Sequence, residues 1–357
     1  MHERALRKVL LIQAIEETDR TGEALPLAER LEATRPLLGK KSPLETQPLP
    51  PPGPSGVSAA PGTQPSAPLS SAAEVFLARR AEILLRSLRT RSPGIDHVLA
   101  VAGGVTSLDR GVLFAAFLVG GLFSFLDRAR GIDIFALPLV ALLAWNLVVY
   151  VSMLRSRPAR SSWFARLYAR SIRNRIESLL GHSTYFNAPL APGLRRFAGD
   201  WWDVAQPLFA ARARRLLHLG AVFVASGLIA GYYIRAEIFR ANAGWYGGNF
   251  LGPDTSHALL SLLYGPALLL TGIDTPSTEV IRQLRWTAEG GGGEATFWVH
   301  LIAWTAGLYI ILPRLLATVW STFSLWHLSR RLVPPAGVAG YVRNVLATER
   351  FGESHDV

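Results

Sequence analysis

The sequence predicts an all-α integral membrane protein with about four transmembrane helices, a re-entrant or interfacial hairpin and cytoplasmic amphipathic helices. Half of the 357 residues are hydrophobic, only 18% are charged, and the mean hydropathy is +0.24. The apolar residues fall in long uninterrupted blocks, as membrane-spanning helices require. The net charge is +11, and most of the basic residues are Arg. No Cys is present, which excludes disulfides, thiolate metal sites and a Cys nucleophile.

The N-terminal part is predicted to be helical and outside the membrane. Residues 1–41 form a small helical segment, in which Leu27 and Leu31 indicate a second short helix. No signal peptide is expected, because no apolar core closely follows the basic start. Residues 42–70 are rich in Pro and predict a disordered linker, with a plain tether favoured over a docking motif. Residues 71–104 predict a basic amphipathic helix region in the cytoplasm. The side chains expected to face inward are Val75, Phe76, Ile83, Leu84 and Leu88.

Two pairs of spans follow. The first transmembrane hairpin covers 105–154: residues 111–126 and 134–154 carry no charge, and the first of these helices is expected to begin near Val105. The second pair covers 216–313, with spans at 216–234 and 295–313. At about 1.5 Å per residue, segments of about 20 residues cross a hydrocarbon core of about 30 Å.

Charge asymmetry predicts the orientation. Residues 155–215 carry twelve arginines against Glu177, Asp200 and Asp203, whereas residues 235–294 carry four arginines against six acids. Because positively charged loops stay in the cytoplasm, 155–215 is predicted inside and 235–294 outside. The tail 314–357 is also basic and is predicted to be a cytoplasmic amphipathic tail. Both termini are then cytoplasmic, and the number of spans is even.

The stretch 256–272 bears on this count. It is apolar but short, and Gly265-Pro266 interrupts it. An even number of spans favours a re-entrant or interface-lying hairpin over a fifth span. The preceding segment, with Trp245, Tyr246 and Phe250, suits the headgroup layer and would cover the outer mouth of the bundle; a pore lining is the alternative. At the last span, the helix either continues through Arg314 or kinks at Pro313.

The basic loop offers a candidate surface. In 155–215, an apolar stripe flanked by arginines recurs at helical spacing: Phe164, Leu167, Tyr168, Ile172, Ile176 and Leu179. A helix lying on anionic lipid and a docking site for a protein partner both fit, and the two are compatible. The residues proposed for this partner or lipid surface are Arg166, Arg170, Arg173, Arg195 and Arg196. Nucleic-acid binding is not predicted, because the arginines cluster at the span ends as topology requires.

Polar residues inside or beside the spans are the remaining candidates for function. These are Asn146, His218, Arg235, Glu237, His300 and Arg314. A hydrogen bond between helices is the simpler role for Asn146, His218 and His300, and Arg235 is expected to pair with Glu237. Gly227 and Gly231 form a small-xxx-small pair that indicates close helix packing. No P-loop, HExxH, GxSxG or GxGxxG motif occurs, and the His spacing suits no metal. We therefore expect no enzyme, no metal site and no cofactor.

Several segments together resemble a bacterial family of multi-pass inner-membrane proteins classed as a domain of unknown function. They are AIEETD (14–19), FLARRAE (76–82), LHL (217–219), AGYYIR (230–235), AGW (243–245), GPALLLTG (265–272) and WVHLIAWTAGLYIILPRLLA (298–317). The family is typically encoded beside a predicted cytoplasmic GTPase. The resemblance implies a bacterial inner-membrane location and a membrane partner for that GTPase, and it supplies no catalytic residues. One departure is that Tyr246-Gly247-Gly248-Asn249 stands where an acidic, hydroxyl-bearing stretch is expected.

These observations give two hypotheses for function. The first is a membrane partner or anchor for a cytoplasmic GTPase, in contact with anionic lipid headgroups and able to form a homo-oligomer. The alternative is a channel or small-solute transporter that uses the Gly-Pro-broken segment 256–272. An integral-membrane enzyme ranks third, because the catalytic motifs are missing.

Overall fold

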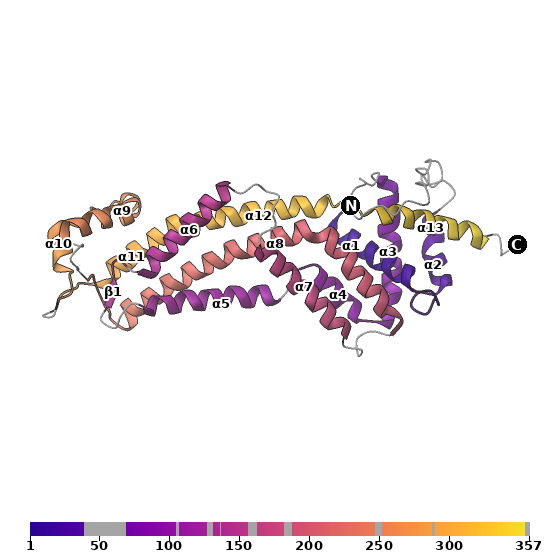
Figure 1. Cartoon of the computed structure of the whole chain (residues 1–357), viewed down its shortest axis with the longest axis horizontal. Helices are drawn as coiled ribbons and strands as arrows, with labels where there is room; N and C mark the ends of the chain where they lie inside the picture. The colour runs from indigo at the N-terminus through magenta and orange to yellow at the C-terminus, as the bar shows by residue number, and fades with distance from the viewer. Residues whose placement is uncertain are drawn as a thin grey trace. The chain divides into compact units, whose positions relative to one another are not determined.

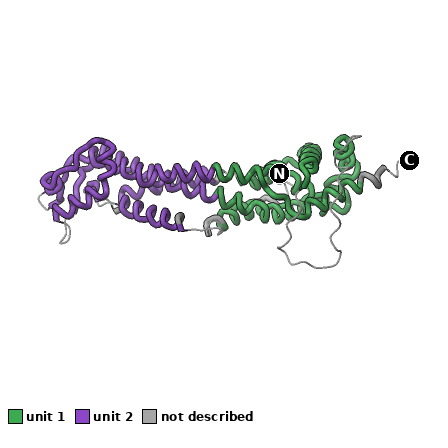
Figure 2. Tube along the Cα trace, turned by 90° about the horizontal axis from the view of Figure 1, so that it is seen from above, with its two compact units in different colours: residues 1–106, 162–212, 323–357 green, residues 107–161, 213–322 purple. Residues whose placement is uncertain are grey.

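A computed structural model of the chain is all-α apart from one pair of short strands (Figure 1). It describes residues 1–38, 69–104, 107–126, 131–135, 137–155, 163–181, 188–246, 252–287 and 290–353. Most of the predicted linker 42–70 therefore lies outside the described residues. The described chain divides into two compact units (Figure 2). Unit 1 contains residues 1–106, 162–212 and 323–357, and unit 2 contains residues 107–161 and 213–322.

Unit 1 is a helical domain with its own core. It contains α1 (Glu3–Thr18), α2 (Leu27–Thr34), η1 (Arg35–Leu37), α3 (Ser71–Arg91), α4 (Gly94–Ala102), α7 (Trp163–Gly181), η3 (Ala188–Leu190) and α13 (Ala336–Glu353). Helices are present in 1–38 and in the predicted helix region 71–104, where α3 and α4 are separate. The break follows from sequence, because Ser92-Pro93 ends α3 and Pro disfavours helical geometry in the residue before it.

The buried face of α3 was predicted only in part. Phe76, Leu84 and Leu88 are buried as expected, but Val75 and Ile83 are exposed. The buried residues of α3 include Leu77, Ala81 and Leu85, which recur at three- and four-residue steps with the confirmed ones. Helical spacing turns both residues toward solvent: Ile83 lies beside that stripe and Val75 on the opposite face of the helix.

The loop 155–215 is also part of this domain. Tyr168, Ile172 and Ile176 of α7 are buried, and α7 packs against α4. The Tyr168 hydroxyl donates to the carbonyl of Gly104 at 2.8 Å. Protein therefore covers these three residues of the predicted apolar stripe, whereas Leu167 is 52% exposed. A helix that lies on lipid through that stripe is the wrong interpretation; its arginine side remains exposed.

Unit 2 contains the apolar helices. They are α5 (Ser107–Phe123), followed by η2 (Ser124–Leu126), α6 (Leu137–Arg155), the part of α8 (Ala191–Tyr233) from residue 213, the π-turn η4 (Ile234–Ile238), α9 (Pro253–Thr271), α10 (Thr278–Gln283), α11 (Ala295–Ala306), the π-turn η5 (Gly307–Ile311) and α12 (Leu312–Arg330), which ends in unit 1. Three helical stretches within the described residues are long and apolar enough to cross a membrane: Asp109–Leu126, Ala191–Ile238 and Ala295–Arg330. The second predicted span, 134–154, contains the shorter apolar helix Pro138–Ser152.

Glycines set the distance between α5 and α8. A Cβ at Gly227 would lie 1.9 Å from the carbonyl oxygen of Phe117, and one at Gly120 would lie 2.0 Å from that of Val224. Only a residue without a side chain fits at either position. The close packing predicted from Gly227 and Gly231 is therefore confirmed, and Gly231 faces Ser124 of η2.

The helix of the last predicted span continues through Pro313. Pro313 has no N–H to donate to the carbonyl of Tyr309, four residues before it. The hydroxyl of Tyr150, from α6, donates to that carbonyl at 3.0 Å. The π-turn η5 directly precedes this point and accommodates the proline within one long helix.

The segment 256–272 does not break at Gly265-Pro266. It belongs to the single helix α9, which starts with Pro253 in its first turn and ends at Gly272 in a left-handed conformation (φ 68°). The reversal comes after Gly272, and α10 packs beside α9. The predicted break at Gly265-Pro266 is therefore wrong.

A small cap completes unit 2. The strands β1 (Gly131–Asp133) and β2 (Asn242–Gly244) pair in parallel, with Ile132 opposite Ala243. Trp245 is fully buried and donates through Nε1 to the carbonyl of Ile281 at 2.7 Å. Trp245 is thus a core residue of this cap, whereas Tyr246 is exposed, and Phe250 lies outside the described residues.

Candidate functional site

The structure brings together three of the predicted polar candidates in unit 2. Arg314 of α12 is only 4% exposed. Its Nε donates to Oδ1 of Asn146, on α6, at 2.7 Å. Its Nη1 lies 3.2 Å from Nδ1 of His218, on α8. Three helices that are distant in sequence thus meet at one buried guanidinium, which we call the Arg314 cluster.

Tyr150 completes the Arg314 cluster and was not predicted. The guanidinium carbon of Arg314 lies 5.2 Å from the centre of the Tyr150 ring, a cation–π contact. Tyr150 follows Asn146 by four residues, so both side chains project from the same face of α6. The four-residue spacing of Asn146 and Tyr150, together with Pro313, is the sequence signal from which a role for Tyr150 could have been predicted.

The protonation pattern of the cluster follows from its geometry. A guanidinium carries only N–H donors, so Nδ1 of His218 must act as the acceptor, and the ring hydrogen is assigned to Nε2. Asn146 accepts through Oδ1 and donates through Nδ2 to the carbonyl of Leu142 at 2.8 Å. All these partners of Arg314 are neutral.

The predicted pair Arg235–Glu237 is replaced by other contacts. Arg235 donates to the carbonyl of Ser124, at the end of α5, and to that of Gly131 at 2.5 Å. Glu237 instead accepts from the hydroxyl of Thr296 at 2.8 Å. The π-turn η4 places Arg235 where it binds the carbonyl of Ser124, directly after α5, and that of Gly131 in strand β1 (Gly131–Asp133). Arg235 therefore has a structural role.

His300 is exposed and lies outside the Arg314 cluster. Its Nδ1 is 2.7 Å from the carbonyl oxygen of Thr296, and its ring meets that of Tyr233 edge to face at 5.4 Å. The hydrogen bond is to a residue of the same helix, α11, so the predicted hydrogen bond between helices is not among the described contacts of His300; its neighbour from another helix is the ring of Tyr233. Nothing in them points to a ligand.

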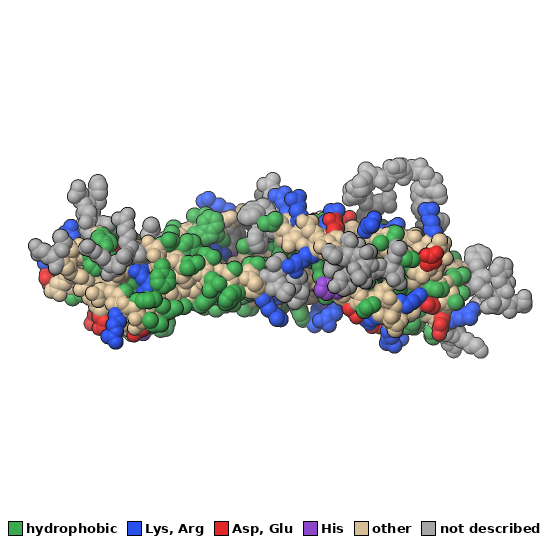
Figure 3. Space-filling model, turned by 90° about the horizontal axis from the view of Figure 1, so that it is seen from below, with side chains coloured by type: hydrophobic (Ala, Val, Ile, Leu, Met, Phe, Trp, Pro, Cys, Tyr) green, Lys and Arg blue, Asp and Glu red, His purple; other side chains and the backbone are tan. Residues whose placement is uncertain are grey.

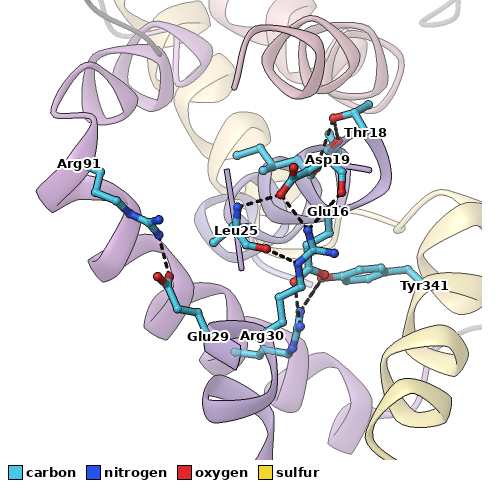
Figure 4. Close-up of polar contacts among 11 residues, drawn as sticks. Glu16, Thr18, Asp19, Leu25, Glu29, Arg30, Arg91 and Tyr341 are labelled. Carbon is cyan, nitrogen blue, oxygen red and sulfur yellow. Dashed lines mark hydrogen bonds and ion pairs between the residues drawn. The ribbon is translucent and has the colours of Figure 1, made fainter. Parts of the chain in front are cut away.

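Unit 1 contains a polar network of a different kind (Figure 4). Arg80 of α3 donates from Nη2 to Oε1 of Glu16 at 2.8 Å and from Nη1 to the Tyr341 hydroxyl at 2.7 Å. Its Nε donates to the hydroxyl of Thr34 at 2.8 Å. Burial alone would lower the pKa of Arg80, but Tyr341 and Glu16 outweigh it and raise that pKa. The network joins α1, α2, α3 and α13.

A second set of polar contacts closes the turn between α1 and α2. Arg30 donates to the carbonyl of Leu25 at 2.7 Å and to the carboxylate of Asp19 at 2.9 Å (Figure 4). Burial would raise the pKa of Asp19, but hydrogen bonds from the backbone N–H groups of Leu25 and Ala24, and the charge of Arg30, lower it overall. A cavity of about 260 Å³ lies beside both the Arg80 network and the Arg30 contacts. The charged side chains that line this cavity already have partners, so the cavity does not indicate a ligand.

The five arginines of the proposed partner or lipid surface are all exposed. Arg173 donates to Glu177 at 2.8 Å and lies 5.8 Å from the ring centre of Trp202. Arg196 pairs with Glu17. Within the described part of the chain, no carboxylate pairs with Arg166, Arg170 or Arg195. These three arginines, which we call the open arginines, carry the unneutralised charge of this surface.

The described ranges contain no group of three or more His, Cys, Asp or Glu side chains that could hold a metal ion. No family model, no curated protein and no solved structure matches the chain.

Proposed function

We propose that this protein is an integral protein of a bacterial inner membrane, in which unit 2 crosses the bilayer and unit 1 lies in the cytoplasm as the docking domain for a soluble partner. The GTPase implied by the family resemblance is the expected partner. One observation carries the proposal: unit 1 is assembled from three chain segments that the apolar helices of unit 2 separate.

Contacts inside unit 1 favour an even number of crossings. The N-terminal amine donates to the carbonyl of Leu332 at 3.0 Å, and Arg212 donates to Glu3 at 2.7 Å. All three segments must then lie on the same side of the membrane. The chain leaves unit 1 at residue 107 and returns by residue 162. If α5 crosses, α6 must cross back, despite its shorter apolar stretch.

The same reasoning applies to α9. The chain leaves unit 1 again after residue 212 and returns at residue 323. One crossing by α8 and one by α11–α12 complete this excursion, so α9 cannot add a single crossing. Its exposed leucines (Leu262, Leu269 and Leu270) favour contact with lipid. We therefore place α9 in the outer leaflet as an interfacial or re-entrant helix.

The surface of unit 2 suits a lipid environment. Large apolar side chains are exposed on its helices, among them Leu122, Trp145, Leu316 and Trp320. Figure 3 shows such side chains gathered over unit 2, whereas charged side chains are frequent over unit 1. A patch of this extent would be unstable in water, which supports membrane insertion.

The sidedness can be tested with single cysteines, because the chain has none. We expect Glu23→Cys and Arg79→Cys, both exposed on unit 1, to resist an impermeant maleimide in intact spheroplasts and to react after lysis. Glu279→Cys on α10 should react in intact spheroplasts. Labelling of Glu23→Cys in intact spheroplasts would overturn the cytoplasmic placement of unit 1.

Docking can be tested through the open arginines. We expect the neighbouring GTPase to copurify with the wild-type protein in mild detergent, and Arg166→Glu with Arg170→Glu to reduce its recovery about tenfold or more. The matched control is Arg79→Glu with Arg86→Glu, which reverses two exposed arginines on α3. Equal recovery with both double variants would exclude this surface, and no recovery with wild type would exclude the GTPase.

A further inference from the structure

We infer that the Arg314 cluster of unit 2 is a binding site for a small monovalent inorganic anion of the halide class. The first observation is the burial of a permanent charge. Arg314 is 4% exposed, and an arginine stays protonated in any protein environment. An isolated buried charge is costly unless a counter-charge lies nearby.

The second observation is the lack of a counter-charge. Residues 137–155, 213–234 and 295–330, which form the helices around Arg314, contain no Asp or Glu. In α5 the one acid is Asp109, in its first turn. No ion pair joins any carboxylate to Arg314 within the described residues. The other titratable groups near the cluster are Tyr150, His218 and the exposed Arg214, one turn before His218 on α8. None of them supplies negative charge at neutral pH.

The third observation is that donor groups remain. Asn146, His218 and the Tyr150 hydroxyl account for three hydrogen bonds of a guanidinium that carries five N–H hydrogens. His218, neutral and with its hydrogen on Nε2, can donate through that atom. The cluster therefore offers hydrogen-bond donors and one net positive charge between three helices.

The size of the charge selects the ligand class. One anion of charge −1 neutralises Arg314, whereas a divalent oxyanion would leave a net negative charge in apolar surroundings. The phosphate of an anionic lipid is the main competing occupant of a buried arginine near a membrane surface. We favour the small free anion because Arg314 is almost completely enclosed by protein.

The test measures anion-specific stabilisation of the purified full-length protein. The melting temperature in neutral detergent is followed by tryptophan fluorescence while sodium chloride replaces sodium gluconate at constant ionic strength. We expect a saturable rise of about 3–6 °C when chloride reaches ten times its Kd. Arg314→Gln should abolish the rise, and Arg240→Gln, which removes an exposed arginine of unit 2, should keep it.

Three results would overturn the inference. They are identical melting curves of the wild type in chloride and gluconate, a chloride effect that survives in Arg314→Gln, and a rise that appears only on addition of phosphatidylglycerol. The last result would assign the site to a lipid phosphate. If Arg314→Gln does not fold, Arg314→Lys serves instead; it keeps the charge, and we expect a chloride effect that saturates at a higher concentration.

Discussion

Arg80 in unit 1 and Arg314 in unit 2 are buried almost equally, at 3% and 4% exposure, but their surroundings differ. Arg80 forms a two-bond ion pair with Glu16 and also binds Tyr341 and Thr34. Among the described residues, the partners of Arg314 are neutral groups. A paired buried arginine ties helices together, whereas one without a carboxylate retains a charge that another partner can neutralise.

The two units also use exposed apolar side chains differently. Unit 1 buries the apolar stripe of α7 against α4 and leaves arginines outside. In unit 2 the helices contact each other closely at glycines, and large apolar side chains, leucines and tryptophans among them, are exposed on the outside. The difference is expected if water surrounds the first and lipid the second, because lipid removes the penalty on exposed apolar area.

The largest expected effect is the difference between two arginine-to-methionine variants. Arg80→Met leaves the Glu16 carboxylate buried without its partner and should destabilise unit 1 by about 3–5 kcal/mol. Arg314→Met removes a charge that lacks a carboxylate, so we expect a change within about 1 kcal/mol in chloride-free buffer. Denaturant unfolding in detergent measures both. Similar losses for the two variants would contradict the comparison.

A second pair of variants compares exposed leucines. Leu316→Asp places a charge on the outer surface of a candidate span and should cost about 2.5–3.5 kcal/mol of insertion free energy. Leu27→Asp alters an equally accessible leucine of unit 1 and should cost less than about 0.5 kcal/mol. The readout is the fraction of protein inserted in membranes. Normal insertion of Leu316→Asp would argue against lipid contact at that position.

The helix contact inside unit 2 can be tested with glycines of α8. Gly227→Ala forces a methyl group against the Phe117 carbonyl, and we expect a loss of about 1–3 kcal/mol. Gly220→Ala meets no atom within 4 Å and should be neutral or stabilising by up to about 1 kcal/mol. Thermal unfolding of the two variants separates packing from helix propensity; a loss of the same size in both would refute the close contact.

The smallest effect is a response of unit 1 to acid. The pKa of Glu82 is lowered chiefly by a hydrogen bond from Lys8, and that of Asp19 is lowered by the contacts described above. A carboxylate with a lowered folded-state pKa stabilises the fold above its unfolded value of about 4, and this contribution is lost as pH falls further. We expect unit 1 to lose stability below about pH 4. In Asp19→Asn with Glu82→Gln that loss should be smaller; an unchanged acid response would assign it to other groups.

The sequence predicted elements wherever a local pattern was sufficient. The helices of residues 1–38, the apolar helices, and the close packing at Gly227 and Gly231 followed from periodicity, hydropathy and residue size. The predicted interruption at Gly265-Pro266 was wrong, because α9 continues through the proline and the chain reverses after Gly272. The parallel pair β1–β2 was not predicted, since three-residue strands from distant segments leave no periodic signal.

The candidate site was predicted as a set of residues but not as an arrangement. Asn146, His218 and Arg314 were chosen because polar groups are costly in apolar helices, and this reasoning needs no tertiary information. It also chose Arg235, which binds the carbonyls of Ser124 and Gly131, and His300, whose hydrogen bond stays within α11; these contacts are structural. Only the packing of α6, α8 and α12 separates the first three from the others.

Composition and charge patterning by themselves determined that the chain is all-α, that its apolar helices suit a membrane, and where its arginines gather. Each of these properties depends on residues that are close in sequence. Tertiary structure alone decided which face of α7 is covered, that Arg80 is neutralised by Glu16, and that Arg314 meets neutral partners from two other helices. Whether a buried charge is paired depends on side chains far apart in the chain, and one sequence does not specify how they pack.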